Sequence, residues 1–437
     1  MAMTNDGTPS DLERATMRRV TLRLLPFLMA CYLVSFIDRV NVGFAALQMN
    51  KDVGLTASMF GLGSGLFFVT YFIFEVPSNL VLEKVGARLW IARIMITWGL
   101  VSAATAFVVG PYSFYLVRFL LGAAEAGFYP GVLLYLTFWF PKSYRARVVA
   151  LFMVSVPAAS FIGSPISAAL LQLDGWLGLH GWQWMSIVEA APAILFGGLA
   201  FYVLPDTPLQ AKWLTEEQRR WLTDRIKGER DGGRSSSRRS TWRGLIDKHV
   251  LAAGLIFAGS TGASACLSIW QPQILKSFGL SNMETGLLNS APFGVAAVLM
   301  VLWAKHSDRT GERVWHLAIP LAATSLSLLL AFTAQSLLPT VAILFVAIVG
   351  TYAIKGPFWA LSTEWMSTSA AAVGIAQINA IGNLGGFVGT YSLGVIKEAT
   401  GSYALGLLPL ALLTAAGTML ALVSGFRQSP AEMARLN

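Results

Sequence analysis

The sequence is short of charged residues, cysteine and histidine, and each shortage excludes a class of protein. Charged residues make up 13% of the 437 residues, against about 25% in soluble domains, which excludes a chain of ordinary soluble domains. Cys31 and Cys266 both lie in apolar stretches, so we expect no disulfide framework. The four histidines are scattered along the chain, so we expect no metal site and no cofactor.

Motifs of common enzymes are also missing. The sequence contains no G-x-S-x-G elbow, no P-loop and no H-E-x-x-H pair. Gly61, Gly63 and Gly65 lie inside an apolar stretch, where they fit helix packing better than phosphate binding. We therefore predict that the chain is not an enzyme.

Long apolar runs dominate the sequence instead. Hydrophobic residues make up 55% of the chain, and a helix that spans a bilayer needs roughly 20 consecutive apolar residues. Twelve runs meet this need, near residues 22–47, 57–82, 89–109, 112–138, 146–172, 184–204, 249–275, 283–304, 314–333, 338–363, 369–396 and 402–426. The predicted fold class is therefore an all-α integral membrane protein with twelve transmembrane helices. The polar N-terminal segment lacks the apolar core of a signal peptide, so we expect the first helix to remain in the mature protein.

The net charge of +9 follows the membrane topology. If the N-terminus is cytoplasmic, the cytoplasmic segments hold 26 of the 32 Lys and Arg residues, and the outer loops hold Lys51, Lys276 and Lys397. This distribution is the positive-inside bias, and it predicts that both termini lie in the cytoplasm. The basic charge therefore points to a lipid bilayer as partner and away from nucleic acid.

A polar segment near the middle of the chain predicts the domain organisation. We expect a cytoplasmic N-terminal segment (1–21), a six-helix half (22–204), a cytoplasmic central loop (205–248), a second six-helix half (249–426) and a cytoplasmic tail (427–437). Within the loop, residues 215–230 have helical spacing with one apolar face, and we expect this helix to lie along the inner membrane surface.

An internal repeat supports two halves. EKVGARLW (83–90) follows the second run, and DRTGERVW (308–315) follows the eighth. Glu83, Gly86, Arg88 and Trp90 match Asp308, Gly311, Arg313 and Trp315 with a constant offset of 225 residues. Such a repeat predicts two pseudo-symmetric halves with a substrate site between them near the midplane.

These loops resemble the signature of the major facilitator superfamily. The likeness covers nearly the whole chain, although Glu83 and Lys84 make the first copy degenerate. The resemblance implies a charged conformational latch at the inner ends of the halves, formed by Glu83, Gly86, Arg88, Asp308, Arg309, Gly311 and Arg313. The alternative is that these are ordinary positive-inside loops.

Several charged residues lie deep inside the predicted spans. They are Asp38, Arg39, Glu75, Arg118, Glu125 and Lys355. A charge at the centre of a spanning helix costs about 3 kcal/mol on insertion scales, so these side chains are expected to face the interior. For any one of them, a purely structural ion pair is the alternative to a functional role.

Arg118 and Glu125 are seven residues apart in RFLLGAAEAGFYPG, on one helix face. Their depths overlap with those of Asp38 and Arg39, so we expect these four residues to share one pocket. An arginine fork binds a carboxylate at two points, and a carboxyl in a dry pocket can take up and release a proton. The set therefore predicts a carrier that couples an organic anion to protons.

Other polar residues extend this pocket. Tyr71 is expected to donate a hydrogen bond to the substrate, whereas Glu75 either contributes to the site or balances an arginine. Lys355, Trp359 and Ser362 share one face of the tenth span by their spacing.

In the eleventh span, Asn379 and Asn383 are expected either to contact substrate or to bond across helices. Gly122 and Gly127 thin the fourth span beside the charges, which permits close neighbours. Glu189, near the outer end of the sixth span, is interpreted as structural.

Four segments resemble the anion:cation symporter family, with bacterial tartrate- and phthalate-type permeases nearest in pattern. They are IDRVN, EVPSN, RFLLGAAEAGFYPG and GPFWAL. The resemblance implies proton-coupled uptake of an organic anion across a bacterial inner membrane. It also implies roles for individual residues: Asp38 and Glu125 as protonation sites, Arg39 as the group coupled to them, Arg118 as the second arginine, and Tyr71, Trp359, Ser362 and Asn379 as substrate contacts.

The chain departs from that pattern at Phe36, which lacks a tyrosine hydroxyl, and at Lys355, an additional cation. A second cation favours a dicarboxylate. We therefore predict proton-coupled uptake of a small dicarboxylate or hydroxy acid such as tartrate, or of an aromatic carboxylate such as phthalate, by a monomer. The alternatives are an exporter or exchanger of organic anions, and a transporter-like sensor.

Overall fold

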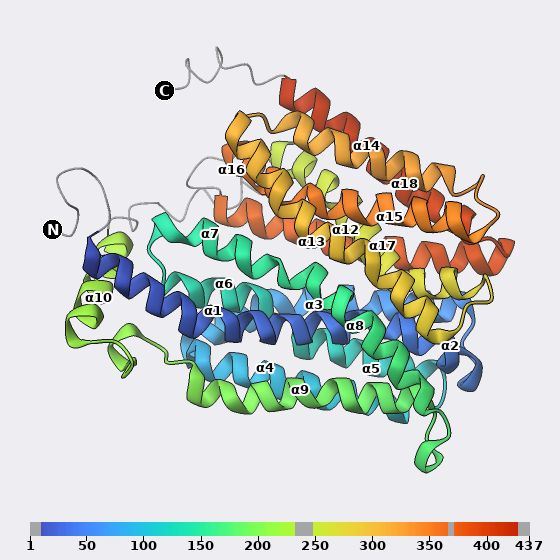
Figure 1. Ribbon diagram of the computed structural model, residues 1–437, viewed down its shortest axis with the longest axis horizontal. Helices are drawn as coiled ribbons and strands as arrows, with labels where there is room; N and C mark the ends of the chain where they lie inside the picture. The colour runs from blue at the N-terminus through green and yellow to red at the C-terminus, as the bar shows by residue number, and fades with distance from the viewer. Residues whose placement is uncertain (1–9, 232–247, 366–370, 427–437) are drawn as a thin grey trace.

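The computed structural model describes residues 10–231, 248–365 and 371–426, and the regular elements in these ranges are helices. Figure 1 shows two packed helical halves. The blue-to-green half contains α1 to α9, and the yellow-to-red half contains α12 to α18.

Six membrane-crossing units form the N-terminal half. They are α1 (Asp11–Val40) with α2 (Val42–Asp52), α3 (Ala57–Val85), α4 (Ala87–Ala104) with η1 (Thr105–Phe107), α5 (Pro111–Glu125) with α6 (Phe128–Thr137), α7 (Lys142–Met153) with α8 (Ser155–Leu170), and α9 (Gly181–Val203). Short 3-10 turns η2 (Leu171–Leu173) and η3 (Trp176–Gly178) join α8 to α9. The first helix starts at Asp11, about three turns before the apolar run begins, because Ser10 caps its N-terminus by accepting a hydrogen bond from the Glu13 N–H.

Six units also form the C-terminal half. They are α12 (Lys248–Lys276), α13 (Asn282–Thr310), α14 (Val314–Leu330), α15 (Leu337–Ala353) with α16 (Lys355–Trp365), α17 (Ala371–Thr400) and α18 (Tyr403–Phe426). Ten of the units in the two halves are long and apolar enough to cross a membrane, and the shorter α14 is also apolar. With α17 they make the twelve predicted spans, so the predicted fold class is confirmed.

The segment between the halves contains η4 (Pro208–Gln210) and α10 (Glu216–Asp231). The apolar face of α10 buries Leu222 and Ile226 against the N-terminal half. Just before α10, Trp213 stacks on Trp139 with ring centres 5.8 Å apart. The predicted amphipathic helix therefore exists and its apolar face packs on the protein, whereas its position along the inner membrane surface stays a prediction.

In the part of the chain that the structure describes, four membrane-crossing units are interrupted, which the hydropathy pattern did not predict. The interruptions lie at Asn41, at Ala126–Gly127, at Val154 and at Ile354. At Gly127 the backbone is left-handed (φ 86°), and an added Cβ would lie 2.2 Å from Ser78 Oγ. Glycine is therefore required for both the conformation and the close approach of α3. Binding sites of transporters are typically built at such discontinuous helices.

The two halves meet mainly through α3 with α17, α8 with α13 and α2 with α12. We call the end of the bundle remote from α10 the outer end, and the end that carries α10 the inner end (Figure 1). At the outer end, hydrogen bonds join the Ser58 N–H to Glu398 Oε2 (2.8 Å) and Asn289 Nδ2 to Ser164 Oγ (2.8 Å). These hydrogen bonds hold the outer ends of the two halves together.

Candidate functional site

Asp38 and Arg39 are adjacent on α1 but face different partners, because successive residues of an α-helix are about 100° apart around its axis. Asp38 faces α4, where its carboxylate accepts hydrogen bonds from Trp98 Nε1 and Ser102 Oγ. It also accepts one from Asn41 Nδ2 at 3.2 Å. Asp38 is 2% exposed, and these three donors are neutral. Asp38 thus binds neutral donors while its charge still acts on Arg118, and a pocket shared by the four residues stays a prediction.

Arg39 turns toward α5 and forms an ion pair with Glu125, the last residue of that helix. Ser35 Oγ donates a hydrogen bond to the same Glu125 oxygen at 2.7 Å. The Arg39 guanidinium carbon lies 4.7 Å from the ring centre of Phe36, 5.0 Å from that of Phe67 and 5.2 Å from that of Tyr71. Arg39 is thus held by one carboxylate and by the faces of three rings.

Arg118 lies on α5, two turns before Glu125, and is 2% exposed. Its guanidinium carbon lies 5.1 Å from the centre of Phe67, so the same ring contacts both arginines. The charges of Asp38 and Glu125 act on it, yet its Nε and Nη2 atoms are buried without a hydrogen-bond partner. A buried donor without a partner costs about 1–3 kcal/mol. This guanidinium is therefore suited to accept an anion.

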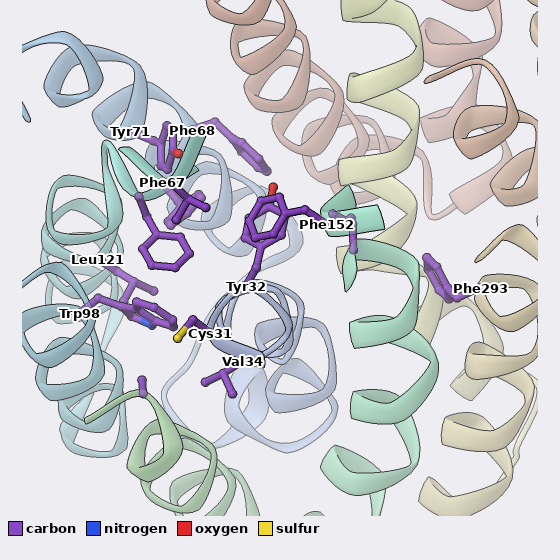
Figure 2. Close-up of a cluster of buried hydrophobic side chains, with 14 of the residues drawn as sticks. Cys31, Tyr32, Val34, Phe67, Phe68, Tyr71, Trp98, Leu121, Phe152 and Phe293 are labelled. Carbon is purple, nitrogen blue, oxygen red and sulfur yellow. The ribbon is translucent and has the colours of Figure 1, made fainter. Parts of the chain in front are cut away.

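Figure 2 shows the buried aromatic rings of this region, and two of them, Phe67 and Tyr71, lie beside Arg39. Tyr32 stacks on Phe152 with ring centres 4.5 Å apart, and Phe67 contacts Tyr71 at 6.0 Å. In Figure 2, Phe67, Phe68 and Tyr71 lie together on one side of the helix that carries Tyr32. Because apolar surroundings strengthen electrostatic interactions, a charge added here interacts strongly with the arginines.

Glu75 connects the two halves. Its Oε1 atom accepts a hydrogen bond from Asn379 Nδ2 of α17 at 2.9 Å. Asn379 therefore makes a bond across helices, which was one of its two alternatives. The charges of Glu75 and Arg39 both act on Tyr71, which lies one turn before Glu75 on α3.

The C-terminal half brings Lys355 to this region. Lys355 is the first residue of α16, directly after the interruption at Ile354. Its Nζ atom lies 4.1 Å from the ring centre of Tyr352, and Arg39 of the other half is near enough for the two positive charges to act on each other. One cation of each half thus faces the interface.

The remaining predicted substrate residues lie further along α16 and α17. Trp359 contacts Phe257 at 5.2 Å between ring centres and packs on a second apolar cluster. Ser362 is buried, and Asn383 Nδ2 is buried without a hydrogen-bond partner. None of their contacts described here reaches the arginines, so their role as substrate contacts stays a prediction.

Sequence reasoning missed the neutral partners of the acids. Asn41, Trp98 and Ser102 hold Asp38, and Asn41 also donates to Glu189 Oε2 at 2.9 Å. The available signal was a carboxyl in an apolar run, which always needs a partner inside the protein. Glu189 carries that signal as clearly as Asp38 does.

The repeated inner loops hold together within each half. In the first loop, Gly86 has a left-handed φ of 97°, and the Arg88 N–H donates to Asp206 Oδ1 at 3.0 Å, beyond the end of α9. The side chain of Glu83 lies outside the described residues. A latch between the halves therefore stays a prediction for another conformation.

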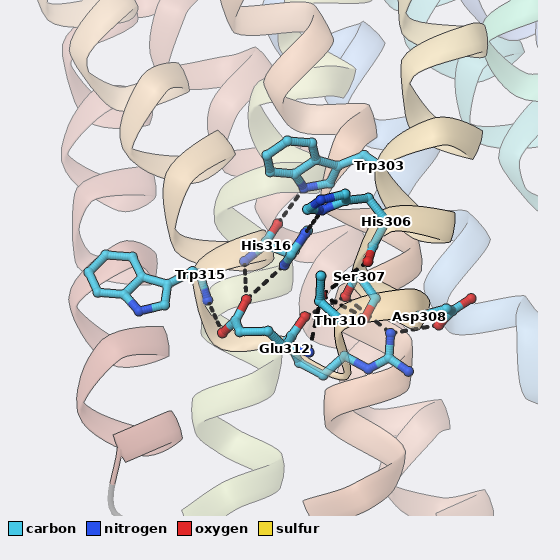
Figure 3. A network of polar contacts seen from close by, with 9 residues as sticks. Trp303, His306, Ser307, Asp308, Thr310, Glu312, Trp315 and His316 are labelled. Carbon is cyan, nitrogen blue, oxygen red and sulfur yellow. Dashed lines mark hydrogen bonds and ion pairs between the residues drawn. The ribbon is translucent and has the colours of Figure 1, made fainter.

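The second loop closes on itself (Figure 3). Gly311 ends α13 in a left-handed conformation, and Arg313 Nη1 binds Asp308 Oδ1 at 2.6 Å. Arg309, on the last turn of α13, is exposed. His306 Nδ1 lies 2.7 Å from His316 Nε2, and His316 Nδ1 lies 2.7 Å from Glu312 Oε2.

Comparison with known proteins decides the family. The pattern of the Major Facilitator Superfamily matches residues 28–390. The chain belongs to the major facilitator superfamily. It is 50% identical over 421 residues to an Agrobacterium vitis protein named "Putative tartrate transporter". This alignment covers 96% of this chain and 93% of the relative. It is 40% identical over 411 residues to the quinolone resistance transporter of Acinetobacter baumannii, covering 94% of this chain and 95% of the relative.

A solved structure shares the fold of this transporter. A bacterial homolog of the human lysosomal transporter Spinster, in an inward-facing and occupied conformation, superposes with a TM-score of 0.75 over 93% of this chain and 98% of that one, at 17% identity. The family pattern and the relatives confirm the predicted superfamily, and the solved structure shares its fold. The protein is a multi-pass secondary transporter of small organic molecules rather than an enzyme.

Proposed function

We propose that this transporter takes up an organic anion together with protons across a bacterial inner membrane, as a monomer with both termini in the cytoplasm. The observation that carries the proposal is the pair of arginines on one ring, Phe67. Arg39 forms an ion pair with Glu125 and leaves one buried nitrogen, Nε, without a partner, whereas Arg118 leaves two, Nε and Nη2. An anion supplies the missing acceptors.

Proton coupling follows from competition for Arg39. While Glu125 is ionised, it occupies the guanidinium and repels a second carboxylate. When Glu125 is protonated, Arg39 becomes free to bind the carboxylate of the substrate at two points. Anion and proton then bind together, and Asp38 provides a second protonation site in a dry environment.

The proposed substrate is a small dicarboxylate or hydroxy acid. The names of the Agrobacterium vitis relatives refer to tartrate, and Lys355 offers a cation for a second carboxylate. An aromatic carboxylate such as phthalate fits the rings beside Arg39 as a second substrate class. Each charge that crosses the membrane potential is worth about 2.3 kcal/mol per 100 mV, so a dianion needs two protons to enter without opposing an inside-negative potential.

Alternating access is proposed to arise from rocking of one half against the other. The halves are joined at the outer end here, so the other state must separate Ser58 from Glu398 and Asn289 from Ser164. Closing the inner ends then brings the repeated loops together as the latch. Tyr71, Trp359, Ser362, Asn379 and Asn383 are proposed to contact substrate when the halves close around it.

Uptake of labelled tartrate and phthalate into proteoliposomes tests this function. An imposed pH gradient, acidic outside, is expected to raise uptake several-fold, and a protonophore is expected to remove the increase. Arg118→Ala is expected to abolish uptake while the protein stays folded. Uptake that ignores the pH gradient, or Arg118→Ala with wild-type uptake, contradicts the proposal.

Export is a second candidate, because the Acinetobacter baumannii relative is named for quinolone resistance. An exporter exchanges protons for substrate. In the same proteoliposomes an inward-directed proton gradient then lowers the accumulated substrate instead of raising it. The sign of the response distinguishes the two directions.

A further inference from the structure

A second buried carboxyl lies beside Asp38. Glu189 of α9 is 5% exposed, accepts a hydrogen bond from Ser167 Oγ at 2.7 Å and accepts another from Asn41 Nδ2 at 2.9 Å. The same Asn41 nitrogen also donates to Asp38 Oδ1 at 3.2 Å. One amide group at the interruption between α1 and α2 thus bridges two carboxyls of different helices.

Two ionised carboxylates cannot share this environment cheaply. Like charges in a dry site repel each other, so one member of such a pair retains a proton. Among the described residues, no cation forms an ion pair with Asp38 or Glu189; the distant attraction of Arg118 acts on Asp38. Around Glu189, α1 contributes Asp38 and α8 contributes Ser167.

The other neighbours of α9 bring no compensating charge to Glu189 within the described ranges. The charged residues of α2 lie at its outer end, where Asp52 accepts a hydrogen bond from Trp182, two turns before Glu189 on α9. From α4, Trp98 and Ser102 bind Asp38.

The donors around the two acids differ, and this difference locates the proton. Asp38 accepts from Trp98 Nε1 and from the Asn41 amide nitrogen, and these two nitrogens only donate. Among the described partners of Asp38, the Ser102 hydroxyl is the one that can either donate or accept. For Glu189, Ser167 lies on the oxygen that Asn41 does not bind. A proton on that oxygen can donate to Ser167, so the geometry fits a protonated Glu189 beside an ionised Asp38.

We propose that Glu189 shares one proton with Asp38 and is a further proton-exchanging residue of the transport cycle, coupled to Asp38 through Asn41. This inference rests on the proposed proton-coupled function. One proton binds a carboxylate oxygen of the pair from one side of the membrane and leaves the same oxygen, or its partner, to the other side. Because Asn41 forms the interruption between α1 and α2, the ionisation state of the pair also acts on the geometry of that interruption.

Glu189→Gln in proteoliposomes tests the inference, with Glu284→Gln, which removes a carboxyl outside the pair at the N-terminus of α13, as the matched control. Counterflow exchange of substrate, which moves no net proton, is expected to persist at half the wild-type rate or more. Proton-driven uptake is expected to lose its wild-type pH profile and to carry fewer protons per anion. An unchanged pH profile and proton-to-anion ratio in Glu189→Gln overturn the inference.

Infrared difference spectroscopy of the purified transporter provides a second measurement that needs no transport. A carbonyl band of a protonated glutamic acid is expected at neutral pH in the wild type, moved by isotope labelling of glutamate and reduced in Glu189→Gln. In Asn41→Ala its pH dependence is expected to change, because the bridge to Asp38 is lost. Absence of proton-driven uptake in the wild type would contradict the proposed function. The infrared band is independent of that result, because it reports directly whether Glu189 holds a proton. Its absence contradicts the sharing.

Discussion

The two halves have similar helices but very different interiors. In the N-terminal half, α1 and α5 carry an ion pair whose glutamate is buried, and α1, α5 and α9 bury a second arginine and two acids held by neutral donors. In the C-terminal half, α12 has charged residues only at its ends, α15 has none, and α16 begins with Lys355. A repeated fold therefore does not imply repeated chemistry: we expect the first half to carry protons and hold the anion, and the second to adjust which anion fits.

The largest effect is expected from breaking the Arg39–Glu125 pair. Arg39→Gln leaves a buried carboxylate without its partner, which costs about 3–5 kcal/mol of stability, so we expect a clearly lower melting temperature. Loss of the guanidinium also removes anion binding, so uptake is expected to fall about 100-fold or more. A 100-fold loss corresponds to about 2.8 kcal/mol, because each ~1.4 kcal/mol is tenfold. Thermal unfolding and uptake in proteoliposomes measure the two effects separately.

The double variant Arg39→Gln/Glu125→Gln is the control. It removes both charges, so stability is expected to recover while uptake stays low. Arg93→Ala provides a matched substitution outside the site, because Arg93 stacks on Trp90 at 3.8 Å instead of joining the pair. If the double variant transports normally, the pair is structural and the assignment of the first half is wrong.

A smaller and more selective effect is expected in the second half. Lys355→Met removes one cation facing Arg39, so binding of a dicarboxylate is expected to weaken roughly tenfold, in line with about 1–3 kcal/mol for one charge-assisted contact. Binding of a monocarboxylate with the same skeleton is expected to change little. Thermal-shift titrations with paired mono- and diacids measure the difference, and Lys276→Met at the outer end of α12 is the control.

An equal loss for both acids contradicts a role in selectivity. It indicates instead that Lys355 acts on the substrate only through the general charge of the interface. An unchanged preference for the diacid places the second carboxylate elsewhere.

Hydropathy predicted the spans because each membrane crossing must be long and apolar, which leaves a signal in composition alone. It did not predict the interruptions at Asn41, Val154 and Ile354. These residues are compatible with a continuous helix, and only packing of neighbouring helices reveals that the helix stops there. Gly127 was noted as a packing residue, and its left-handed backbone shows that it also ends a helix.

The candidate site was predicted in part for a similar reason. Arg118 and Glu125, seven residues apart, share one helix face and do act on each other. Asp38 and Arg39, directly adjacent, diverge, and Asp38 binds α4. Depth in the membrane can be read from the sequence, but the direction of a side chain depends on which helices surround it. The same limit hid the bridge from Asn41 to Glu189.

The inner loops provide the smallest difference between the halves. The first loop is tied to Asp206, whereas in the second loop Glu312 accepts the N–H groups of Trp315 at 2.7 Å and of His316 at 3.2 Å. Partial burial alone would raise the pKa of Glu312, but these N–H groups and the His316 ring outweigh it and lower the pKa. A pKa lowered by folding means that the contribution to stability is present above the ordinary value of about 4.3 and is lost as the pH falls through the folded value.

Glu312→Gln is therefore expected to loosen the start of α14 at neutral pH by the ~0.3–1 kcal/mol typical of a carboxylate at a helix N-terminus. Hydrogen exchange of a peptide covering 311–320 measures this directly. In the wild type the protection of the same amides, relative to their intrinsic exchange rates at each pH, is expected to fall only under acidic conditions, and in the variant this change in protection disappears. Glu284→Gln, which removes the matching carboxylate at the N-terminus of α13, is the control and is expected to leave exchange of the 311–320 peptide unchanged. If this peptide exchanges faster in Glu284→Gln as well, Glu312 acts through global stability. The second loop is then no more self-contained than the first.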